Sequence, residues 1–440
     1  MQQVGQVTKM RDADPVLSPA RPWERYSPRE RTLLLVVLFL VGTSNFVDRN
    51  IIGVLLEPIK AEFGASDTML GLLSGLSFAV FYATLGLPVA RWADRGDRRF
   101  IITLSLTVWS VMTALCGMAQ SFWQLALARV GVGAGEAGAI PPAQSLIADY
   151  FPPDRRARAI GIFMLSSMAG YILGMAGGGW IAQNYGWRTA FLAVGLPGLA
   201  LAILARWILK EPRHLPQFRV DPTAQESISN TCRALFAKAA YRNIVWAMII
   251  YYLMAYGALI FTVPFVIRVH NLTVAEAGAI FGGVSAVGAV LGSVFGGSLA
   301  DRLAKRDMAV FAWLPGWGLI AALPLYEAAL LAPSVTAMAV ILLVASTLLA
   351  GVVPPIFAAL LSVCGSSRRA MAVAIVFFFA NLVGLGAGPV VAGALSDYFA
   401  LAYGPADGLR YAMMIMMCAF LPSGIFMLRA ARTMRADVED

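Results

Sequence analysis

Four ionisable residues lie inside long apolar stretches of the 440-residue chain: Asp48, Arg49, Arg129 and Glu136. Placing a charged side chain at the centre of a membrane costs roughly 2.5–3.5 kcal/mol on insertion scales, so each such residue is a functional hypothesis. A buried carboxylate can take up and release a proton, and a nearby guanidinium can neutralise it or bind an anion. The chemistry open to these four residues is therefore proton transfer and anion binding in apolar surroundings.

The positions of these residues along two predicted helices bring them to similar depths. Asp48 lies past the middle of the first apolar stretch, by about 6 Å toward the outer side at 1.5 Å per residue. Arg129 lies before the middle of the fourth stretch, which runs in the opposite direction, so the two side chains can pair. Glu136 follows Arg129 by two turns and shares its helix face. Arg49 points about 100° away from Asp48 around the helix and faces a different neighbour.

Two interpretations of these charges remain open. In the first, they are structural ion pairs that hold the first half of the bundle together. In the second, they form a protonation switch, with Asp48 as the first choice for the proton carrier and Glu136 as the second. Arg129 then holds or releases the proton, or anchors an anionic headgroup. Arg49 is a further candidate for both roles.

The second half of the chain has no charged residue deep in its apolar stretches. It has aromatic side chains and few hydrogen-bonding groups, so a cavity between the halves would be charged on one wall and apolar on the other. Such a cavity suits an amphipathic substrate, although packing and lipid contact are the alternative roles for most of the aromatic residues. The predicted substrate-binding residues are Arg129, Arg49, Glu136, Asn45, Tyr82, Tyr252, Tyr256, Phe378 and Asn381.

The composition requires that the helices carrying these residues cross a membrane. Hydrophobic residues make up 59% of the chain and charged residues only 13%, and the mean hydropathy is +0.72. A soluble globular protein has roughly 25% charged residues. The outer surface must therefore face hydrocarbon, and we predict an all-α integral membrane protein.

Twelve apolar stretches are long enough to span a membrane, and one long polar interruption separates the first six from the last six. The expected organisation is an N-terminal cytoplasmic segment (1–31), an N-terminal six-helix half (32–209), a linker with a possible amphipathic helix near 225–240 (210–243), a C-terminal six-helix half (244–430) and a tail (431–440). The predicted spans are 32–57, 68–90, 100–119, 122–147, 159–182, 188–209, 244–269, 275–299, 309–330, 334–362, 370–396 and 409–429. The proline pairs Pro141-Pro142 and Pro354-Pro355 predict breaks in the fourth and tenth spans.

The basic residues set the orientation. With the N-terminus inside, 28 of the 34 Lys and Arg fall in cytoplasmic segments, two lie in the membrane, and four lie in external loops (Lys60, Arg188, Arg268 and Arg410). Both termini are therefore expected to be cytoplasmic. The charge of +9 is explained by topology, which argues against nucleic-acid binding.

Two loops at corresponding places in the halves repeat an Asp-Arg pair followed by bases, 207 residues apart: Asp94-Arg95 and Asp301-Arg302. Parallel six-helix halves are a known repeat plan of secondary transporters. Charges of this kind can hold one packing of the halves, or they are ordinary solvated loop charges. The predicted cytoplasmic gate comprises Asp94, Arg95, Arg98, Asp149, Arg158, Asp301 and Arg302.

These loops resemble the Gly-x-x-x-Asp-Arg-x-Gly-Arg-Arg signature of the major facilitator superfamily, with Ala90 in place of the first Gly and Asp97 in place of one base. Gly393-Ala394-Leu395-Ser396-Asp397 is a further partial match. Asn45-Phe46-Val47-Asp48-Arg49-Asn50 and the glycine-rich stretch 129–137 are similar to the Spinster branch, which includes sphingolipid and lysophospholipid transporters. The resemblance implies the major facilitator fold, with two halves related by pseudo-two-fold symmetry, and a bacterial inner-membrane protein.

The function expected from these features is secondary active transport by alternating access, coupled to protons, of an amphipathic lipid-like substrate such as a lysolipid. An exporter of drug-like or small organic anions is the alternative, and a polytopic membrane enzyme is a distant one. The two histidines and four scattered cysteines show no metal-ligand spacing, and no nucleotide-binding Gly-x-x-x-x-Gly-Lys-Ser/Thr loop occurs. We therefore expect no metal, no cofactor apart from the coupling proton, no partner besides substrate and bilayer, and a monomer.

Overall fold

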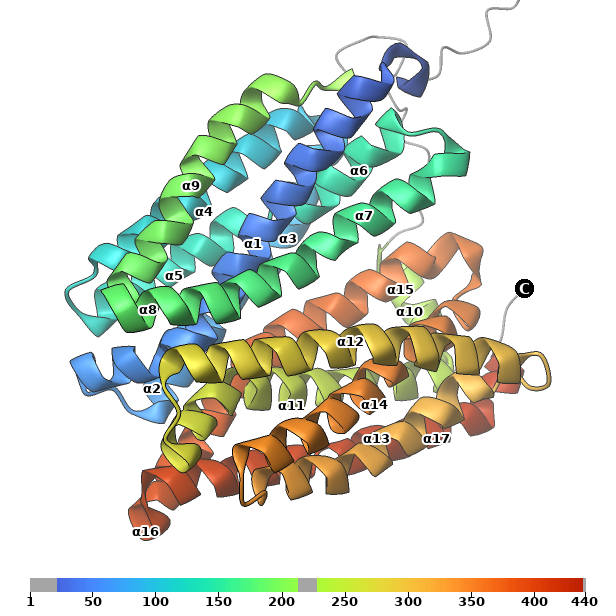
Figure 1. Cartoon of the computed structure of the whole chain (residues 1–440). Coiled ribbons are helices and arrows are strands. Elements are labelled where there is room, and N and C mark those ends of the chain that lie inside the picture. Colours follow the sequence, from blue (N-terminus) through green and yellow to red (C-terminus); the bar gives the residue numbers. More distant parts are fainter. Residues whose placement is uncertain (1–21, 213–227, 438–440) are drawn as a thin grey trace, which may run out of the picture.

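The computed structural model describes residues 22–212 and 228–437, all of it helix, turn or loop in those ranges. The helical rods form two bundles, one from each half of the sequence (Figure 1). The first bundle contains α1 (Pro28–Phe63), α2 (Asp67–Gly71), η2 (Leu72–Leu76), α3 (Ser77–Arg95), α4 (Arg98–Met118), α5 (Phe122–Glu136), α6 (Ile140–Tyr150), α7 (Pro153–Ile172), η3 (Leu173–Gly177), α8 (Gly178–Tyr185) and α9 (Trp187–Ile208).

The second bundle begins after the linker, whose described end forms the predicted helix, α10. Residues 213–227 of the linker and the segments 1–21 and 438–440 lie outside the described residues. The second bundle contains α10 (Ile228–Ala237), α11 (Ala239–His270), α12 (Val274–Ala304), α13 (Val310–Leu330), α14 (Val335–Ser362), α15 (Gly365–Phe379), η6 (Ala380–Ala387), α16 (Gly388–Met417) and α17 (Phe420–Asp437).

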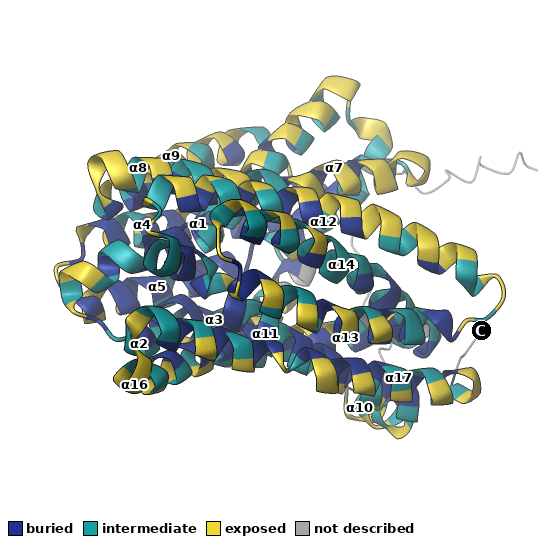
Figure 2. Ribbon diagram, turned by 60° about the horizontal axis from the view of Figure 1, so that its bottom comes forward, coloured by how far each residue is buried: buried dark blue, intermediate teal, exposed yellow. Residues whose placement is uncertain are grey.

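The outside of this molecule is apolar, as a surface in contact with hydrocarbon must be. Large hydrophobic side chains are widely exposed, including Trp207 (77%) and Leu401 (89%). Burial follows the bundle axes, with buried residues inside and exposed ones on the outer faces (Figure 2). In the described residues, nine helices are long and apolar enough to cross a membrane. Together with the multiple apolar rods, this defines a multi-pass membrane protein.

Each of the twelve predicted spans coincides with a helical rod. The rods over 122–150 and 310–330 are not among the nine helices that are long and apolar enough to cross a membrane. The helical run 371–437 counts as one of the nine but contains two predicted spans. Within that run the chain reverses at Gly404, whose φ of 79° is in the left-handed region that favours glycine. This turn separates the last two rods.

Side-chain caps begin many of the rods. Ser27 and Glu30 form a capping box at the start of α1, and Thr273 and Glu276 form another at the start of α12. In each box the hydroxyl accepts from a backbone N–H and the carboxylate accepts from the cap N–H, which satisfies two donors that the helix leaves free.

Of the two helix breaks predicted at proline pairs, the structure has one. The fourth span is interrupted by a turn over residues 137–139, between α5 and α6, so Glu136 is the last residue of its helix. The tenth span is not broken: α14 runs through Pro354 and Pro355 without interruption. A proline removes one helical hydrogen bond, but it is tolerated in membrane-spanning helices because neighbouring groups re-satisfy the freed backbone carbonyl.

The two bundles meet along π-helical segments. In η2 and η3 of the first bundle and η6 of the second, the helix widens. The segment η2 contacts η6, and η3 contacts α12 across the interface. Wider turns of this kind are frequent at functional sites in helices. We name the ends of the molecule after the predicted orientation, so that the turn at residues 64–66 is at the outer end.

Candidate functional site: two buried ion pairs facing an apolar wall

Two neighbouring residues on α1 bind two residues on α5, two turns apart. The Arg129 Nη1 atom lies 3.3 Å from the Asp48 Oδ1 atom, and both side chains are 1% exposed. The Arg49 Nη2 atom lies 2.8 Å from Glu136 Oε2, and its Nε also donates to that oxygen at 3.2 Å. Thr113 of α4 donates its hydroxyl to Asp48. The four intramembrane charges are thus gathered into two adjacent pairs in the first bundle.

The Arg49 guanidinium is enclosed by aromatic rings as well as by its carboxylate partner. Its central carbon lies 4.6 Å from the ring centre of Tyr82, 5.1 Å from that of Phe78 and 5.7 Å from that of Phe46. A cation over an aromatic face is attracted by the ring quadrupole, more strongly where water is excluded. The rings stabilise the charged guanidinium and fix its direction.

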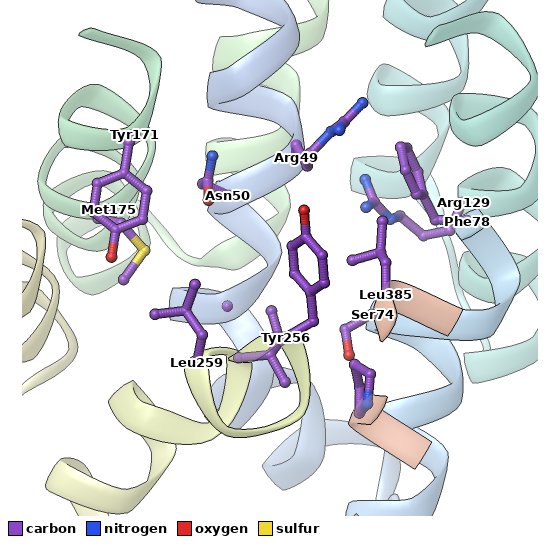
Figure 3. Close-up of a pocket in the computed structure, with 13 residues that line it drawn as sticks. Arg49, Asn50, Ser74, Phe78, Arg129, Tyr171, Met175, Tyr256, Leu259 and Leu385 are labelled. Carbon is purple, nitrogen blue, oxygen red and sulfur yellow. The ribbon is translucent and has the colours of Figure 1, made fainter. Parts of the chain in front are cut away.

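A cavity of about 70 Å³ lies next to the two pairs, between the bundles. Its lining combines Arg49 and Arg129 from the first bundle with apolar groups and one tyrosine from the second. Figure 3 shows the Tyr256 hydroxyl pointing toward Arg49, with Leu259 and Leu385 beside it. The wall contributed by the second bundle is therefore apolar and aromatic, with a single hydroxyl aimed at the charged side.

The predicted substrate-binding residues fall into three groups. Arg49, Arg129 and Tyr256 line the cavity. Tyr82 lies on Arg49, Tyr252 stacks on Tyr256 at 5.8 Å, and Asn45 and Glu136 are buried behind the cavity wall. Phe378 and Asn381 are not among the residues that line it, and the Asn381 amide donates to the Phe377 carbonyl of its own helix.

The predicted cytoplasmic gate includes a buried cluster that lies within the first bundle. Arg98 is 0% exposed and binds Asp149 at 2.6 Å and Glu211 at 2.5 Å, while its Nη1 donates to Ser145. Glu211 also accepts from the Arg98 backbone N–H at 2.8 Å. Because all four residues belong to the first bundle, this cluster stabilises the inner end of one half. The role of Asp149 in a cytoplasmic gate stays a prediction; in this structure its carboxylate binds Arg98 of the same bundle.

The other predicted gate residues are not brought together. Arg158, Asp301 and Arg302 are exposed, and they form no ion pair with another residue whose side chain the structure describes. The side chains of Asp94 and Arg95 lie outside the described residues.

A charged network at the outer end was not expected from the sequence. Arg268 of α11 binds Glu57 of α1 and Asp67 of α2, each at 2.6 Å, and Asp397 of α16 accepts from the start of α2. The sequence held two signals for it: Arg268 in an external position, and Asp397 at the end of the partial signature 393–397. Neither signal predicts the contact, because nothing in one sequence shows which ends of the two halves meet.

The described residues contain no group of three or more His, Cys, Asp or Glu that could hold a metal ion.

Two helical bundles that cross the membrane and enclose a charged cavity at their interface define a membrane transporter. The sequence profile of the Major Facilitator Superfamily matches residues 38–329. The chain belongs to this superfamily; it is a transporter and not an enzyme.

Three relatives show which members of the superfamily the chain resembles. The crystal structure of a bacterial homologue of the human lysosomal transporter Spinster, in an inward-facing and unoccupied conformation, superposes with a TM-score of 0.86 at 32% identity, over 94% of this chain and 100% of that one. An MFS-type efflux pump of Mycolicibacterium smegmatis is 33% identical over 95% of this chain and 96% of its own length. Protein spinster homolog 1 of Xenopus tropicalis is 27% identical over 90% of this chain and 79% of its own length. The chain thus resembles Spinster proteins and efflux pumps alike.

Proposed function

We propose that this protein couples the movement of protons to the transport of an amphipathic, anionic, lipid-like substrate such as a lysolipid. The observation that carries the proposal is the pairing of two buried carboxylates with two arginines on one wall of a cavity whose other wall is apolar. The proposed setting is a bacterial inner membrane, with both termini cytoplasmic and a monomer as the working unit.

The Asp48–Arg129 pair supports proton coupling. While Asp48 is ionised, it holds Arg129 by charge attraction, and protonation of the carboxylate removes that attraction. The contact between them is long at 3.3 Å, and the Arg129 Nε has no acceptor among the described residues. Arg129 also lines the cavity. A proton on Asp48 therefore frees a guanidinium for an anionic group in the cavity.

The cavity walls support an amphipathic substrate. An anionic headgroup would lie against Arg129 and Arg49, and an apolar chain would lie against Leu259, Ile260 and Leu385. The cavity volume of about 70 Å³ is well below the roughly 300–1,000 Å³ of pockets that bury a drug-sized ligand. The bundles must therefore separate further to admit a lipid-sized molecule, as alternating access requires.

Export of drug-like or small organic anions is the second candidate. It is favoured by the similarity to the mycobacterial efflux pump, which extends over almost the whole of both chains. The tyrosine ladder of Tyr252 and Tyr256 could stack on a planar aromatic anion as readily as it packs against a lipid chain. In both candidate functions the anionic group of the substrate binds the charged wall. The functions differ in whether a lipid chain or an aromatic ring lies against the apolar wall.

Transport by the purified protein in proteoliposomes tests the proposal. Labelled lysosphingolipid and a labelled aromatic carboxylate are compared, each with and without an imposed pH gradient and with the gradient in both directions. Gradient-dependent movement of the lysolipid supports the first candidate, and movement of the aromatic carboxylate alone supports the second. Transport of either substrate at equal rates with and without the gradient contradicts proton coupling.

Replacing Arg129 by Ala is expected to weaken the binding of anionic ligands roughly 10- to 100-fold, as the loss of a charged hydrogen bond predicts. Neutral analogues of the same chain length should be affected much less. Ligand affinity measured for both kinds by tryptophan fluorescence or calorimetry provides the comparison. Arg129→Lys is the matched control, because it retains the charge beside Asp48 and loses the planar fork. Equal losses for anionic and neutral ligands would assign Arg129 a structural role.

A further inference from the structure

The outer end of the molecule contains a set of contacts that joins the two bundles. We call it the outer clasp and define it by the six residues that form it: Glu57, Asp67, Thr68, Arg268, Ser396 and Asp397. Its first part is an arginine fork. Arg268 of the second bundle is 8% exposed and binds Glu57 and Asp67 of the first, with N–O distances of 2.6 Å to each.

The second part of the outer clasp is an exchange of hydrogen bonds between α2 and α16. The Asp397 carboxylate accepts from the backbone N–H of Asp67 at 2.9 Å, and from the backbone N–H and hydroxyl of Thr68 at 2.8 and 2.6 Å. In return, the Ser396 hydroxyl donates to the Asp67 carboxylate at 2.6 Å. Asp67 is therefore bound by the opposite bundle as well as by Lys60 of its own bundle, and Asp397 accepts hydrogen bonds from the opposite bundle.

Glycines allow the two backbones to approach closely at the same place. A Cβ atom added at Gly393 would lie 2.1 Å from the Asp67 carbonyl oxygen, and one added at Gly71 would lie 2.2 Å from the Pro389 carbonyl oxygen. These are backbone atoms, which cannot move aside as a flexible side chain would. At the outer interface the backbones of the two bundles are in direct contact, and any side chain at Gly393 would force them apart.

At the inner end, the side-chain ion pairs of the described residues stay within one bundle. Arg98 binds Asp149 and Glu211 in the first bundle, and Arg435 binds Asp307 in the second at 2.8 Å. Within the part of the chain that the structure describes, the ion pairs between bundles are those of Arg268 at the outer end. These ion pairs lie at the end of the molecule where α2 and the start of α12 bring the two bundles together (Figure 1).

The outer clasp is connected to the site by the helices that they share. The helix α1 carries Glu57 two turns beyond Arg49, and α11 carries Arg268 three turns beyond Tyr256. A rearrangement of the Arg49–Glu136 pair or of the cavity wall therefore acts on the same two rigid rods that end in the outer clasp.

We propose that the outer clasp is the contact that holds the transporter closed on the outer side, and that its opening is the step that exposes the site to that side. The inference goes beyond the proposed substrate and coupling ion, because it concerns the balance between conformations with nothing bound. Its test therefore needs neither a substrate nor a pH gradient.

The test measures distances between spin labels in the full chain, reconstituted in lipid nanodiscs. One pair, at Ala61→Cys and Leu401→Cys, reports on the outer end, and a second pair, at Arg155→Cys and Arg302→Cys, reports on the inner end. All four positions are exposed. The accessible native cysteines, Cys232 and Cys418, are first replaced by Ser. Arg268→Gln and Asp397→Asn each remove charged hydrogen bonds between the bundles, and Gly393→Ala separates the backbones without changing any charge.

Arg268→Gln and Asp397→Asn should each increase the population with a long outer distance and a short inner distance by about tenfold or more, since a charged hydrogen bond is worth at least about that factor. Gly393→Ala should shift the two distances in the same direction, because its added Cβ collides with the Asp67 carbonyl. Asp407→Asn is the control for charge, because Asp407 binds Arg410 within the second bundle at the same end. Gly161→Ala is the control for glycine, because no atom lies within 4 Å of its added Cβ. An unchanged distance distribution in Gly393→Ala and in either charge variant, in protein with normal thermal stability, would overturn the proposal.

Discussion

Replacement of Asp48 by Asn is expected to abolish transport driven by a pH gradient while the protein remains folded. The amide has nearly the same shape as the carboxylate and can still accept the hydroxyl of Thr113, but it cannot carry a proton at any accessible pH. Arg129 then stays free of its counter-ion in every state, so a change of pH no longer alters the charged wall. Counterflow of substrate without a gradient should persist, because exchange does not require net proton movement.

The measurement is uptake into proteoliposomes with an imposed gradient, compared with counterflow in the same vesicles. Glu136→Gln is the informative companion, since it makes the equivalent change in the adjacent pair with Arg49. If Asp48 is the carrier, Asp48→Asn removes all gradient dependence, and Glu136→Gln reduces the rate without removing it. Full gradient dependence in Asp48→Asn would exclude Asp48 from the mechanism and return the two pairs to a structural role.

Replacement of Glu211 by Ala is expected to cause the largest loss of stability of any single change at the inner end. Arg98 is fully buried, and both its guanidinium and its backbone N–H donate to the Glu211 carboxylate, whose side chain is 1% exposed. Removing one partner of a buried ion pair costs about 3–5 kcal/mol, and the partner that Arg98 would keep, Asp149, compensates its charge only in part because it is 29% exposed. We expect a clearly lowered unfolding temperature in detergent and a lower yield of folded protein.

Two variants separate charge from packing in that result. Asp149→Ala should cost much less, because Asp149 is 29% exposed and water can replace it. The double variant Arg98→Leu with Glu211→Leu removes both charges and should recover much of the stability lost in Glu211→Ala. A double variant as unstable as Glu211→Ala would show that shape, and not the unpaired charge, accounts for the loss.

Much of the fold could be predicted from the sequence because the membrane imposes strong rules. A helix must be about 20 apolar residues long to cross, so the spans were visible one by one. The break in α14 was predicted wrongly, because a proline pair marks where a helix can bend, and tertiary packing decides whether it does. The π-helical segments could not be predicted, since they depend on contacts between the bundles.

In the candidate site, too, a contact within one bundle could be predicted from the sequence, and a contact between the bundles could not. The pairing of Asp48 with Arg129 followed from helix rise and direction alone, because both residues belong to one bundle with a regular geometry. The partners of Arg268 and Arg98 were missed for opposite reasons. Arg268 binds across two bundles whose docking no local pattern encodes, and Glu211 lies in the polar stretch that was predicted as linker. Its carboxylate nevertheless folds back as a cap on α4.

The separation of charge between the two bundles has a consequence for how such transporters acquire new substrates. The two carboxylate–arginine pairs proposed to couple transport to protons lie on α1 and α5, whereas the apolar wall at Leu259, Ile260 and Leu385 belongs to the other bundle. Mutations on that wall can accumulate without changing either ion pair. Cargo preference can therefore evolve, or be engineered, independently of the driving force, and a library confined to these three positions is the place to begin.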